Sequence, residues 1–387
     1  MSKLPLEGIQ VADFSRVLAG PYCSMMLADL GADVIKVEHP KGDETRSWGP
    51  PFVSGESAYF LSVNRNKRSI TLDLKNETDL KKAHNLIRES DVLLHNFKVG
   101  DSKKLQLDID TVKTLNPTII YAHISAYGST GPDASKPGYD LLAQAITGFM
   151  SITGEANGQA TKVGVAIIDV LAGLNTALGI LASLYAQQTQ GLRAREVESS
   201  LLEAGLASLV NVASNYLVTG ETPKRYGNAH ASIVPYQAFE TADAPLVIAA
   251  ANNKQFAALA RVLGKEAWLK DERFQDNPNR VENRDVIVSD IQNILNTKSR
   301  AHWLELLANA GVPAAPVNTL SEVFESEQVR VRQMVLSNKS LLYKDTPLVA
   351  AGFKLDGQAT ALYRHPPALG EHKDELEERL KGKDEDF

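Results

Sequence analysis

A single carboxylate, Asp169, interrupts an otherwise uncharged stretch that runs from Val163 to Ala186. A carboxylate in apolar surroundings loses hydration and needs compensating partners, and ionisable groups in such places are often functional. The stretch is long enough to cross a membrane, but its glycines, Asn175 and Thr176 dilute its apolar character. The sequence therefore favours a buried helix of a large soluble protein, with Asp169 as a candidate functional residue.

Asp169 also has a purely structural interpretation. Helical periodicity starts around it, and aspartate is favoured at helix N-caps. The two roles are compatible, because a helix N-terminus favours the ionised form of a carboxylate and would keep it ready to react. Both interpretations stay open at this point.

Composition and charge exclude several classes of protein. At 387 residues the chain is too long for one compact core, so two domains are expected. The net charge of -6 argues against general nucleic-acid binding. Cys23 is the only cysteine, which excludes an internal disulfide and a cysteine redox pair, and no metal site is expected. The opening segment MSKLPLEG has no apolar signal core, so we expect a cytoplasmic protein without a membrane partner.

The first half of the chain alternates strand-like and helix-like segments. This alternation is typical of parallel βαβ units with helices on both faces of the sheet. It predicts an α/β fold with an open, mostly parallel, Rossmann-like sheet. The predicted strands are 9–14, 34–38, 70–74, 92–97 and 119–125, and a representative helix is 79–89.

The second half has a different organisation. A long helical segment at 200–218 ends in a turn-rich stretch, and a domain boundary is expected near residue 225. The sequence predicts a large domain at 1–199, a linker helix at 200–225, a small α+β domain at 226–333 and a return to the large domain at 334–387. Predicted strands of the small domain are 234–239 and 246–250, and its predicted helices are 253–263, 285–295 and 301–310.

The loop after the first strand speaks against a dinucleotide site. It has one glycine before Pro21 and no G-x-G-x-x-G, which a pyrophosphate cradle needs for its tight turn. Two basic runs are expected to be either solvated surface or a phosphate site at a sheet edge. Asn96 and Phe97 follow a predicted strand, where an aromatic ring beside cations could hold an adenine and phosphates. The basic residues are Arg65, Lys67 and Arg68 in one run, and Lys98, Lys103 and Lys104 in the other.

Several motifs together resemble the class III coenzyme A-transferases, a family that includes formyl-CoA transferases, carnitine CoA-transferases and α-methylacyl-CoA racemases. The resemblance covers nearly the whole chain. It is carried by LEGIQVADFSRVLAGPYCSMMLADLGADVIKVEHPKGDETR, NRNKRSITLDLK, HNFKVG, PGYDLLAQAITGFMSITG, VGVAIIDVLAGL and PPALGEH. Three further motifs, WGPPF, YFLSVNRNKRSI and RYGNAHASIVPYQAF, look most like succinate–hydroxymethylglutarate (glutarate) CoA-transferases.

The resemblance implies roles for particular residues. Asp169 falls on the family's nucleophilic aspartate, which attacks the acyl-CoA thioester to form an aspartyl anhydride and then an aspartyl–CoA thioester. Acyl-CoA is then a substrate, and no permanently bound cofactor is implied. The family assembles as an interlocked homodimer. Positions that contact coenzyme A in the family match Val17, Ala19, Lys75, Asn96, Phe97 and Lys104, and His39 stands where some relatives have a basic side chain.

Tyr139 separates the transferase hypothesis from a racemase of the same family. Family racemases place a histidine there for proton transfer, and a tyrosine of ordinary pKa is a poor base. Asp140 is expected to cap the helix that follows it. An acyl-CoA racemase or isomerase, and a non-catalytic acyl-CoA-binding protein, remain the alternatives.

The segment 227–237 lies where some relatives carry a glycine-rich loop that closes over the intermediate, and the run of glycines is missing here. We expect Arg225, His230 and Ser232, in or beside this segment, to bind the distal carboxylate of a dicarboxylic acid, since such an anion needs a cation or several donors. For His230 a structural hydrogen-bonding role is an equal alternative.

Overall fold

The computed structural model describes residues 4–191, 195–337, 340 and 342–381. The chain forms two compact units. The large unit contains residues up to Phe149, Val163–Glu221 and the residues from Glu327 onwards. The small unit contains Met150–Lys162 and Thr222–Ser326.

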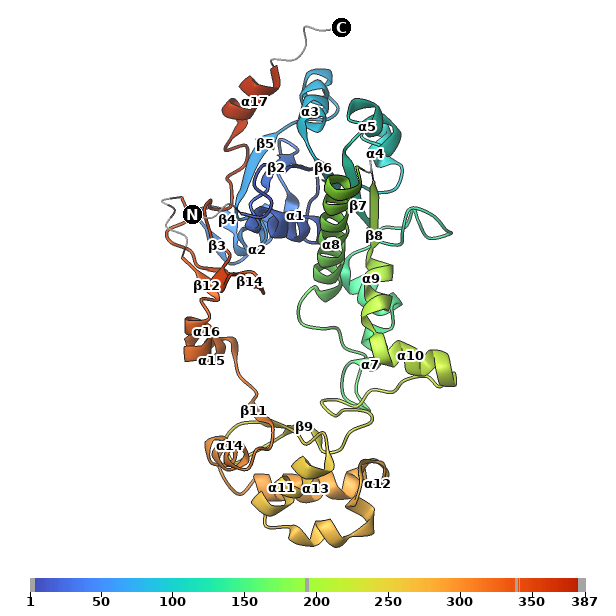
Figure 1. Cartoon of the computed structure of the whole chain (residues 1–387), viewed down its shortest axis with the longest axis vertical. Helices are drawn as coiled ribbons and strands as arrows, with labels where there is room; N and C mark the ends of the chain where they lie inside the picture. The colour runs from blue at the N-terminus through green and yellow to red at the C-terminus, as the bar shows by residue number, and fades with distance from the viewer. Residues whose placement is uncertain (1–3, 192–194, 338–339, 341, 382–387) are drawn as a thin grey trace. The chain divides into compact units, whose positions relative to one another are not determined.

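The large unit is built on a six-stranded sheet with the strand order β5-β2-β1-β6-β7-β8 (Figure 1). Every neighbouring pair is parallel. The order reverses at β1, which has β2 on one side and β6 on the other. This confirms the α/β fold with an open parallel sheet. The strands are β1 (Gln10–Asp13), β2 (Asp33–Glu38), β5 (Lys67–Thr71), β6 (Val92–His95), β7 (Ile120–Ser125) and β8 (Glu196–Ser200).

Helices cover both faces of this sheet. On one face, α1 (Ala19–Asp29) packs against α8 (Ile167–Gln190), and both contribute to a core with the inward side chains of β1 and β6. A Cβ atom on Gly173 of α8 would lie 2.6 Å from the carbonyl oxygen of Ala19, so the close approach of these helices requires glycine. The other face carries a second core with α3 (Glu77–Glu89), α5 (Ile109–Leu115) and α17 (Lys373–Lys381).

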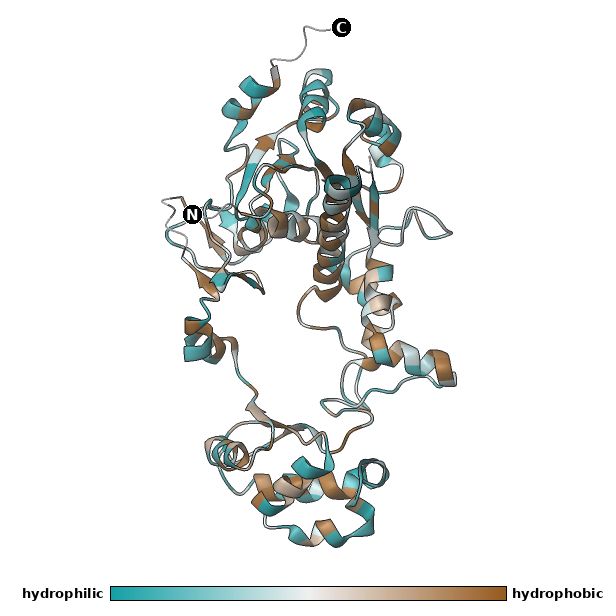
Figure 2. Cartoon of the chain, in the orientation of Figure 1, coloured by the Kyte–Doolittle hydropathy of each residue, from teal (hydrophilic) through white to brown (hydrophobic). Residues whose placement is uncertain are grey.

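The apolar sequence of helix α8 predicts a helix buried on all sides, but among the described residues only one of its faces is buried. Ile168, Ala172 and Ile180 are buried in the core beside the sheet, as expected. Leu178 and Tyr185 are each 67% exposed, so the opposite face has no cover within the described part of the chain. Figure 2 shows the apolar character along this helix. By length and composition α8 could cross a membrane, and the bent pair of helices that follows β8 passes the same test.

The predicted helical segment at 200–218 is two helices. These are α9 (Leu201–Ser208) and α10 (Val210–Thr219), bent by 79° at the break between them. Val210 has a φ of 41°, a backbone conformation that a β-branched residue rarely adopts and that no propensity pattern predicts.

The remaining elements of the large unit are short. Those before α8 are η1 (Glu44–Ser47), β3 (Phe52–Val53), β4 (Glu56–Ser57), α2 (Ala58–Ser62), α4 (Asp101–Lys104) and α6 (Asp140–Ile146), and α7 (Phe149–Ile152) spans the point where the chain first passes into the small unit. Those near the C-terminus are α16 (Glu327–Val331), β12 (Val335–Leu336), β13 (Leu348–Val349), β14 (Lys354–Leu355) and β15 (Gln358–Ala359).

The small unit packs helices on a three-stranded antiparallel sheet of order β11-β10-β9. The predicted strands and helices of this unit are confirmed within a few residues, whereas the strand nearest Pro316 was not predicted. The elements are β9 (Tyr236–Phe239), β10 (Leu246–Ala249), α11 (Asn253–Val262), η2 (Glu266–Lys270), η3 (Glu272–Phe274), α12 (Asn277–Glu282), α13 (Arg284–Leu295), α14 (Arg300–Asn309), β11 (Ala314–Pro316) and α15 (Leu320–Glu325).

The first basic run is neither solvated surface nor a phosphate site, so that expectation was wrong. Arg65 and Lys67 are buried, and each reaches a buried aspartate from a distant part of the chain. The Arg65 guanidinium lies 2.5 Å from Asp29, and the Lys67 ammonium lies 3.4 Å from Asp13. Because acids from α1 and β1 neutralise them, these cations hold strand β5 in the sheet.

Candidate active site

A cavity of about 150 Å³ lies in the large unit, beyond the carboxyl ends of β1, β6 and β7. Ligands of doubly wound sheets bind at this edge, beside the point where the strand order reverses. The fold therefore brings residues from distant loops to one cavity. Six of the residues predicted from the sequence line it, namely Val17, Ala19, Asn96, Phe97, Tyr139 and Asp169.

Asp169 is the third residue of α8 and lines the cavity from the first turn of that helix. The helix begins after Ala166, so Asp169 is not its N-cap. The cap comes from another helix: Asp140 Oδ1 accepts hydrogen bonds from the backbone N–H groups of Ile168 at 2.8 Å and of Asp169 at 3.3 Å. The expectation that Asp140 caps its own helix was therefore wrong, because it caps α8 from across the fold.

Burial raises the pKa of Asp169 to about 7, and the negative charge of Asp140 contributes to this rise. The expected effect of the helix N-terminus does not prevail, since a second carboxylate occupies the first N–H groups of α8. Among the residues that the structure describes, none donates a hydrogen bond to the carboxylate oxygens of Asp169. The protonated form of Asp169 is therefore favoured more than in an ordinary aspartate, and no protein donor stabilises its anion among the described residues.

Gln144 holds Asp140 in this position. Its side-chain nitrogen donates to Asp140 Oδ2 at 2.5 Å, and its side-chain oxygen accepts from the backbone N–H of Val163 at 2.8 Å. Gln144 and Asp140 are both buried. Together they connect α6 to the segment that leads into α8, so the first turn of α8 has a fixed place at the cavity.

Two aromatic residues are related to Asp169 in different ways. Tyr139 precedes α6, lines the cavity and is 55% exposed. Tyr59 of α2 packs edge-to-face on Trp48 with ring centroids 5.4 Å apart. Burial and the charge of Asp169 raise the pKa of Tyr59 to about 12, which places its hydroxyl in the field of that carboxylate. Sequence reasoning missed Tyr59, although a motif containing it supported the family resemblance.

Two predicted coenzyme A contacts follow β1: Val17 lies in the loop between β1 and α1, and Ala19 is the first residue of α1. Asn96 supports this loop: its amide oxygen accepts from the Arg16 N–H at 3.0 Å, and its amide nitrogen donates to the Arg16 carbonyl at 2.7 Å. Both polar ends of the Asn96 side chain are thus engaged with backbone.

Phe97 presents an aromatic surface at the same edge of the sheet. Its ring stacks on His95 with centroids 4.9 Å apart, and the residue also lines the cavity. The His95 Nδ1 accepts from the Phe97 N–H at 3.2 Å, and its Nε2 lies 2.7 Å from the Tyr121 hydroxyl. Burial lowers the pKa of His95 to about 3, so it is a neutral support for Phe97.

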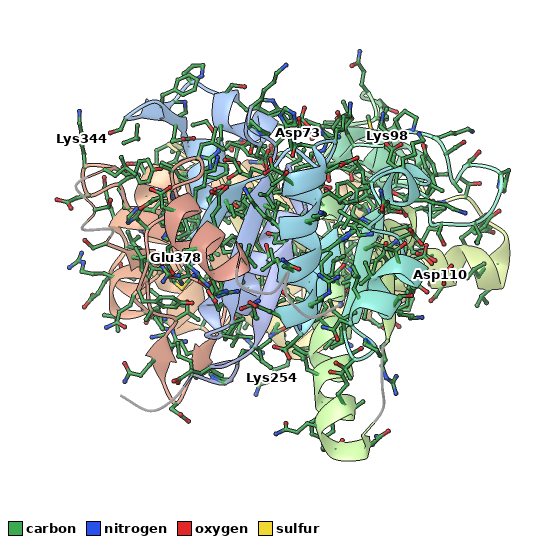
Figure 3. All side chains as sticks on the ribbon, turned by 90° about the horizontal axis from the view of Figure 1, so that it is seen from above. Asp73, Lys98, Asp110, Lys254, Lys344 and Glu378 are labelled. Carbon is green, nitrogen blue, oxygen red and sulfur yellow. The ribbon has the colours of Figure 1, made fainter. Side chains whose placement is uncertain are left out.

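Three cations lie around this cavity, and of these only Lys98 belongs to a basic run singled out from the sequence. Arg16, Lys98 and Lys136 are exposed and contribute to its lining. Figure 3 shows Lys98 at the outer part of the large unit. Arg16 lies 3.5 Å from Glu44 and Lys136 lies 2.6 Å from Asp133, which leaves Lys98 without an ion-pair partner among the described residues. Adjacent positive charge suits a phosphate-bearing ligand.

Three predicted contacts lie outside this lining. His39 is exposed, and its Nδ1 accepts from the Lys41 N–H at 3.0 Å. Lys75 is exposed, and Lys104 is paired with Asp101 at 2.8 Å. Their contact with coenzyme A stays a prediction.

In the small unit, Arg225 binds the backbone of the segment Met150–Lys162. Its guanidinium donates to the backbone carbonyls of Ser151, Glu155 and Gly158 at distances of 3.4 Å, 3.3 Å and 2.9 Å, and so fastens Met150–Lys162 to the rest of the unit. All three of its nitrogens are used by these carbonyls, and its role toward a carboxylate stays a prediction.

His230 and Ser232 belong to one turn of the small unit. The His230 Nδ1 accepts from the Ser232 N–H at 3.1 Å, and the imidazole packs on Tyr236 with centroids 5.4 Å apart. Arg284 donates to the His230 carbonyl at 2.9 Å. The turn is internally bonded, and its role in substrate binding stays a prediction.

No cluster of three or more histidine, cysteine, aspartate or glutamate side chains suited to a metal occurs in the described part of the chain. The thiol of Cys23 is buried, and burial raises its pKa far above the usual range. It is therefore unsuited to act as a nucleophile.

A comparison with known proteins identifies the family of this chain. The sequence pattern of CoA-transferase family III matches residues 6–373. The chain belongs to CoA-transferase family III. The resemblance seen in the motifs and the expectation of a CoA-transferase enzyme are thereby confirmed.

Relatives with assigned names are similar over most of their lengths. A succinyl-CoA:glutarate CoA-transferase from Mus musculus is 39% identical over 372 residues, covering 96% of this chain and 85% of that protein. A succinate–glutarate CoA-transferase from Agrobacterium fabrum is 40% identical over 386 residues, covering 96% and 94%. The crystal structure of a CAIB/BAIF family protein from Brucella suis is 38% identical, with a TM-score of 0.88 and coverage of 98% and 100%.

Proposed function

We propose that this member of CoA-transferase family III moves coenzyme A from an acyl-CoA thioester such as succinyl-CoA to a free dicarboxylic acid such as glutarate. The observation that carries the proposal is the position of Asp169, a carboxylate that faces the cavity without a cation or a hydrogen-bond donor among the described residues. The names of the two similar relatives support the choice of substrates.

The first step uses the ionised form of Asp169 as the nucleophile. One carboxylate oxygen attacks the thioester carbonyl, the carbon–sulfur bond breaks, and the products are a mixed aspartyl anhydride and the coenzyme A thiolate. The thiolate then attacks the aspartyl carbonyl, which releases the donor acid as a carboxylate and leaves an aspartyl–CoA thioester. No proton is consumed, and no metal or redox group is needed for the balance.

The acceptor acid reverses these steps. Its carboxylate attacks the aspartyl–CoA carbonyl, expels the thiolate and forms a new anhydride, and the thiolate attacks the acceptor's carbonyl to release the new acyl-CoA and free Asp169. The protein contributes positioning, exclusion of water and donors to the transient oxyanions. Exclusion of water matters because both covalent intermediates hydrolyse readily. Tyr139 brings a hydroxyl group to the cavity lining, and the charge of Asp169 acts on the hydroxyl of Tyr59, so both are candidates to assist.

The test is direct. The protein is mixed with succinyl-CoA and a panel of carboxylic acids, glutarate included, and the thioesters are separated by chromatography. A new acyl-CoA without ATP is expected. Hydroxylamine attacks the activated aspartyl carbonyl and releases coenzyme A, so mass spectrometry should find a hydroxamate on the peptide that contains Asp169. An absence of exchange across the panel would overturn the proposal.

Two alternatives give different results in the same experiment. A racemase or isomerase incorporates deuterium from deuterated water at the α-carbon and needs no acceptor acid. A binding protein retains coenzyme A affinity and shows no turnover. Tyr139 in place of a proton-transferring histidine favours the transferase.

We also propose that the protein acts in the cytoplasm as a homodimer, interlocked as the family resemblance implies. Exposed apolar side chains support an assembly: Leu178 and Tyr185 on α8 are each 67% exposed, and Leu217 and Val218 on α10 are 80% and 84% exposed. Light scattering in dilute buffer should give twice the chain mass, and a monomer at micromolar concentration would contradict the dimer. Cell fractionation tests the location.

A further inference from the structure

We propose that the buried ion pair of Asp43 and Lys36 is a positioning pair that holds Val17 in a left-handed backbone conformation beside the cavity of Asp169. This inference rests on the proposed transferase function. It assigns a role to two residues that neither contact the reacting atoms nor line the cavity.

Val17 has an unusual backbone conformation. Its φ is 70°, in the left-handed region where the Cβ of a β-branched residue is crowded. Such a conformation persists only when the surroundings over-determine it, and it is concentrated at functional sites. Val17 lines the same cavity as Asp169, so its backbone path decides where one wall of the cavity stands.

Asp43 provides the anchor for Val17. The Val17 N–H donates to the two carboxylate oxygens of Asp43 at 3.2 Å and 3.4 Å. The same carboxylate caps the short helix η1 by accepting from the Thr45 N–H at 3.0 Å. Asp43 is therefore held by an element of its own and does not depend on the Val17 loop for its position.

Lys36 binds both Asp43 and the backbone of the same loop. Its ammonium lies 3.0 Å from Asp43 Oδ2 and donates to the Ser15 carbonyl at 2.9 Å. The side chains of Lys36 and Asp43 are 0% and 1% exposed. Despite the opposing effect of burial, Lys36 and the hydrogen bonds from Thr45 lower the pKa of Asp43, and the surrounding acids raise the pKa of Lys36, so both remain ionised at neutral pH.

The loop is thus held at three consecutive residues. Lys36 binds the carbonyl of Ser15, Asn96 binds both backbone groups of Arg16, and Asp43 binds the N–H of Val17. The buried pair of Arg65 and Asp29, by contrast, connects parts of the scaffold that do not line the cavity. The Asp43–Lys36 pair differs because its hydrogen bonds end on the cavity wall.

The experiment is a double-mutant cycle between positions 43 and 17. Asp43→Asn keeps an oxygen for Thr45 but turns an amide donor toward the Val17 N–H and Lys36, so Val17 loses its anchor. We expect kcat/KM for succinyl-CoA to fall by about ten- to a hundredfold, since a misplacement of about 1 Å costs that much. Val17→Gly adopts a positive φ without crowding. In the Val17→Gly background Asp43→Asn should therefore cost several-fold less than in the wild-type background.

Asp29→Asn is the matched control, because it also removes the charge of a buried aspartate with a cationic partner. It should lower the unfolding midpoint while leaving kcat/KM unchanged. If Asp43→Asn does not fold, the pair Lys36→Met with Asp43→Asn leaves no unpaired buried charge and takes its place in the cycle.

An equal cost of Asp43→Asn in the wild-type and Val17→Gly backgrounds would overturn the inference, and so would unchanged kcat/KM when Asp43→Asn is made alone. The cycle is also measured as the dissociation constant of coenzyme A by calorimetry, which needs no turnover. A wild-type protein that exchanges no coenzyme A would end the proposed function, whereas loss of coupling in the binding cycle would end this inference alone.

Discussion

Two pairs of acids in the large unit have opposite surroundings. Asp169 and Asp140 lie at the first turns of α8 and α6, with no cation paired to them among the described residues, and the pKa of Asp169 is raised to about 7. Glu38 ends β2 and Asp43 precedes η1. They lie 2.7 Å from Arg46 and 3.0 Å from Lys36, respectively, and their pKa values are lowered.

The difference separates a reactive acid from structural ones. A carboxylate that a cation and several donors satisfy gains nothing by attacking an electrophile, because it would lose those partners. The anion of Asp169 has none of these partners among the described residues, so bond formation relieves an uncompensated and partly buried charge. Burial of an acid is thus no sign of catalysis by itself, and the absence of a neutralising partner is the informative feature.

The largest effect should come from Asp169→Asn. Loss of the nucleophile should lower the exchange rate by at least about a thousandfold, as is typical when covalent catalysis is removed. The rate is measured with succinyl-CoA and glutarate, with binding of coenzyme A as the control for folding. If Asp169→Asn exchanged coenzyme A as fast as the wild type, Asp169 would not be the reactive acid.

The same variant should be more stable than the wild type, and more so at pH 8 than at pH 5. Because the folded-state pKa is raised above the ordinary value, the folded state holds a proton that the unfolded chain loses between pH 3.8 and about 7. Stability conferred by this group is therefore lost as the pH rises through that window, and asparagine avoids the loss. Thermal melts at the two pH values give the comparison.

Arg46→Met should have the next largest effect, this time on stability. The Arg46 guanidinium makes two hydrogen bonds to Glu38, at 2.7 Å and 2.9 Å, and lies over the ring of Phe60. Its removal leaves Glu38 buried without its cation, so the free energy of unfolding should fall by about 3–5 kcal/mol in urea titrations. Arg273→Met removes an exposed cation that pairs with Asp271 and should leave the free energy of unfolding nearly unchanged. Equal effects of the two would contradict the distinction.

Asp140→Asn should sharpen the comparison through pH dependence. Asparagine keeps an oxygen to accept from Ile168 but removes the charge that raises the pKa of Asp169. In the wild type kcat/KM should rise with pH through about 7, because only the ionised Asp169 attacks. In the variant this rise should move to lower pH by about one unit. Gln144→Glu, which disturbs the same contact but adds negative charge, should not move the rise downward, and an unmoved profile in Asp140→Asn would show that burial alone sets the pKa.

Tyr59→Phe should give the smallest change. The ring would keep its packing on Trp48, while the hydroxyl in the field of Asp169 would be lost. If this hydroxyl donates to a transient oxyanion, the lost hydrogen bond of about 0.5–1.5 kcal/mol corresponds to a decrease of about two- to tenfold in kcat/KM. The decrease should appear with every donor thioester, and a decrease with only one would assign Tyr59 to specificity instead.

The hydrophobic pattern of the sequence was sufficient to predict most strands of the six-stranded sheet. The predicted strands coincide with β1, β2, β6 and β7 to within two residues, because their apolar runs are buried on both faces. The strand predicted at 70–74 is Lys67–Thr71 in the structure, since its buried cations look polar until their acids are known. Strand β8, with the sequence EVESS at the sheet edge, has no apolar run and was missed.

The sequence predicted some features of the site, and only the structure showed others. The lone acid in an apolar stretch identified Asp169 as the residue to examine, and the motifs added Val17, Asn96, Phe97 and Tyr139, all of which line one cavity. The sequence did not show that Asp140 caps α8, because the two helices are joined only through tertiary contacts.

What the sequence determined is therefore the chemistry available: the candidate nucleophile, the order of strands and helices, and the family. Local patterns carry that information because hydrophobic periodicity and residue type act over a few neighbours. The tertiary structure decided which acids are neutralised. A pKa depends on charges within a few ångströms, and for Asp169 and Asp43 those charges come from Asp140 and Lys36, which only the fold brings into contact.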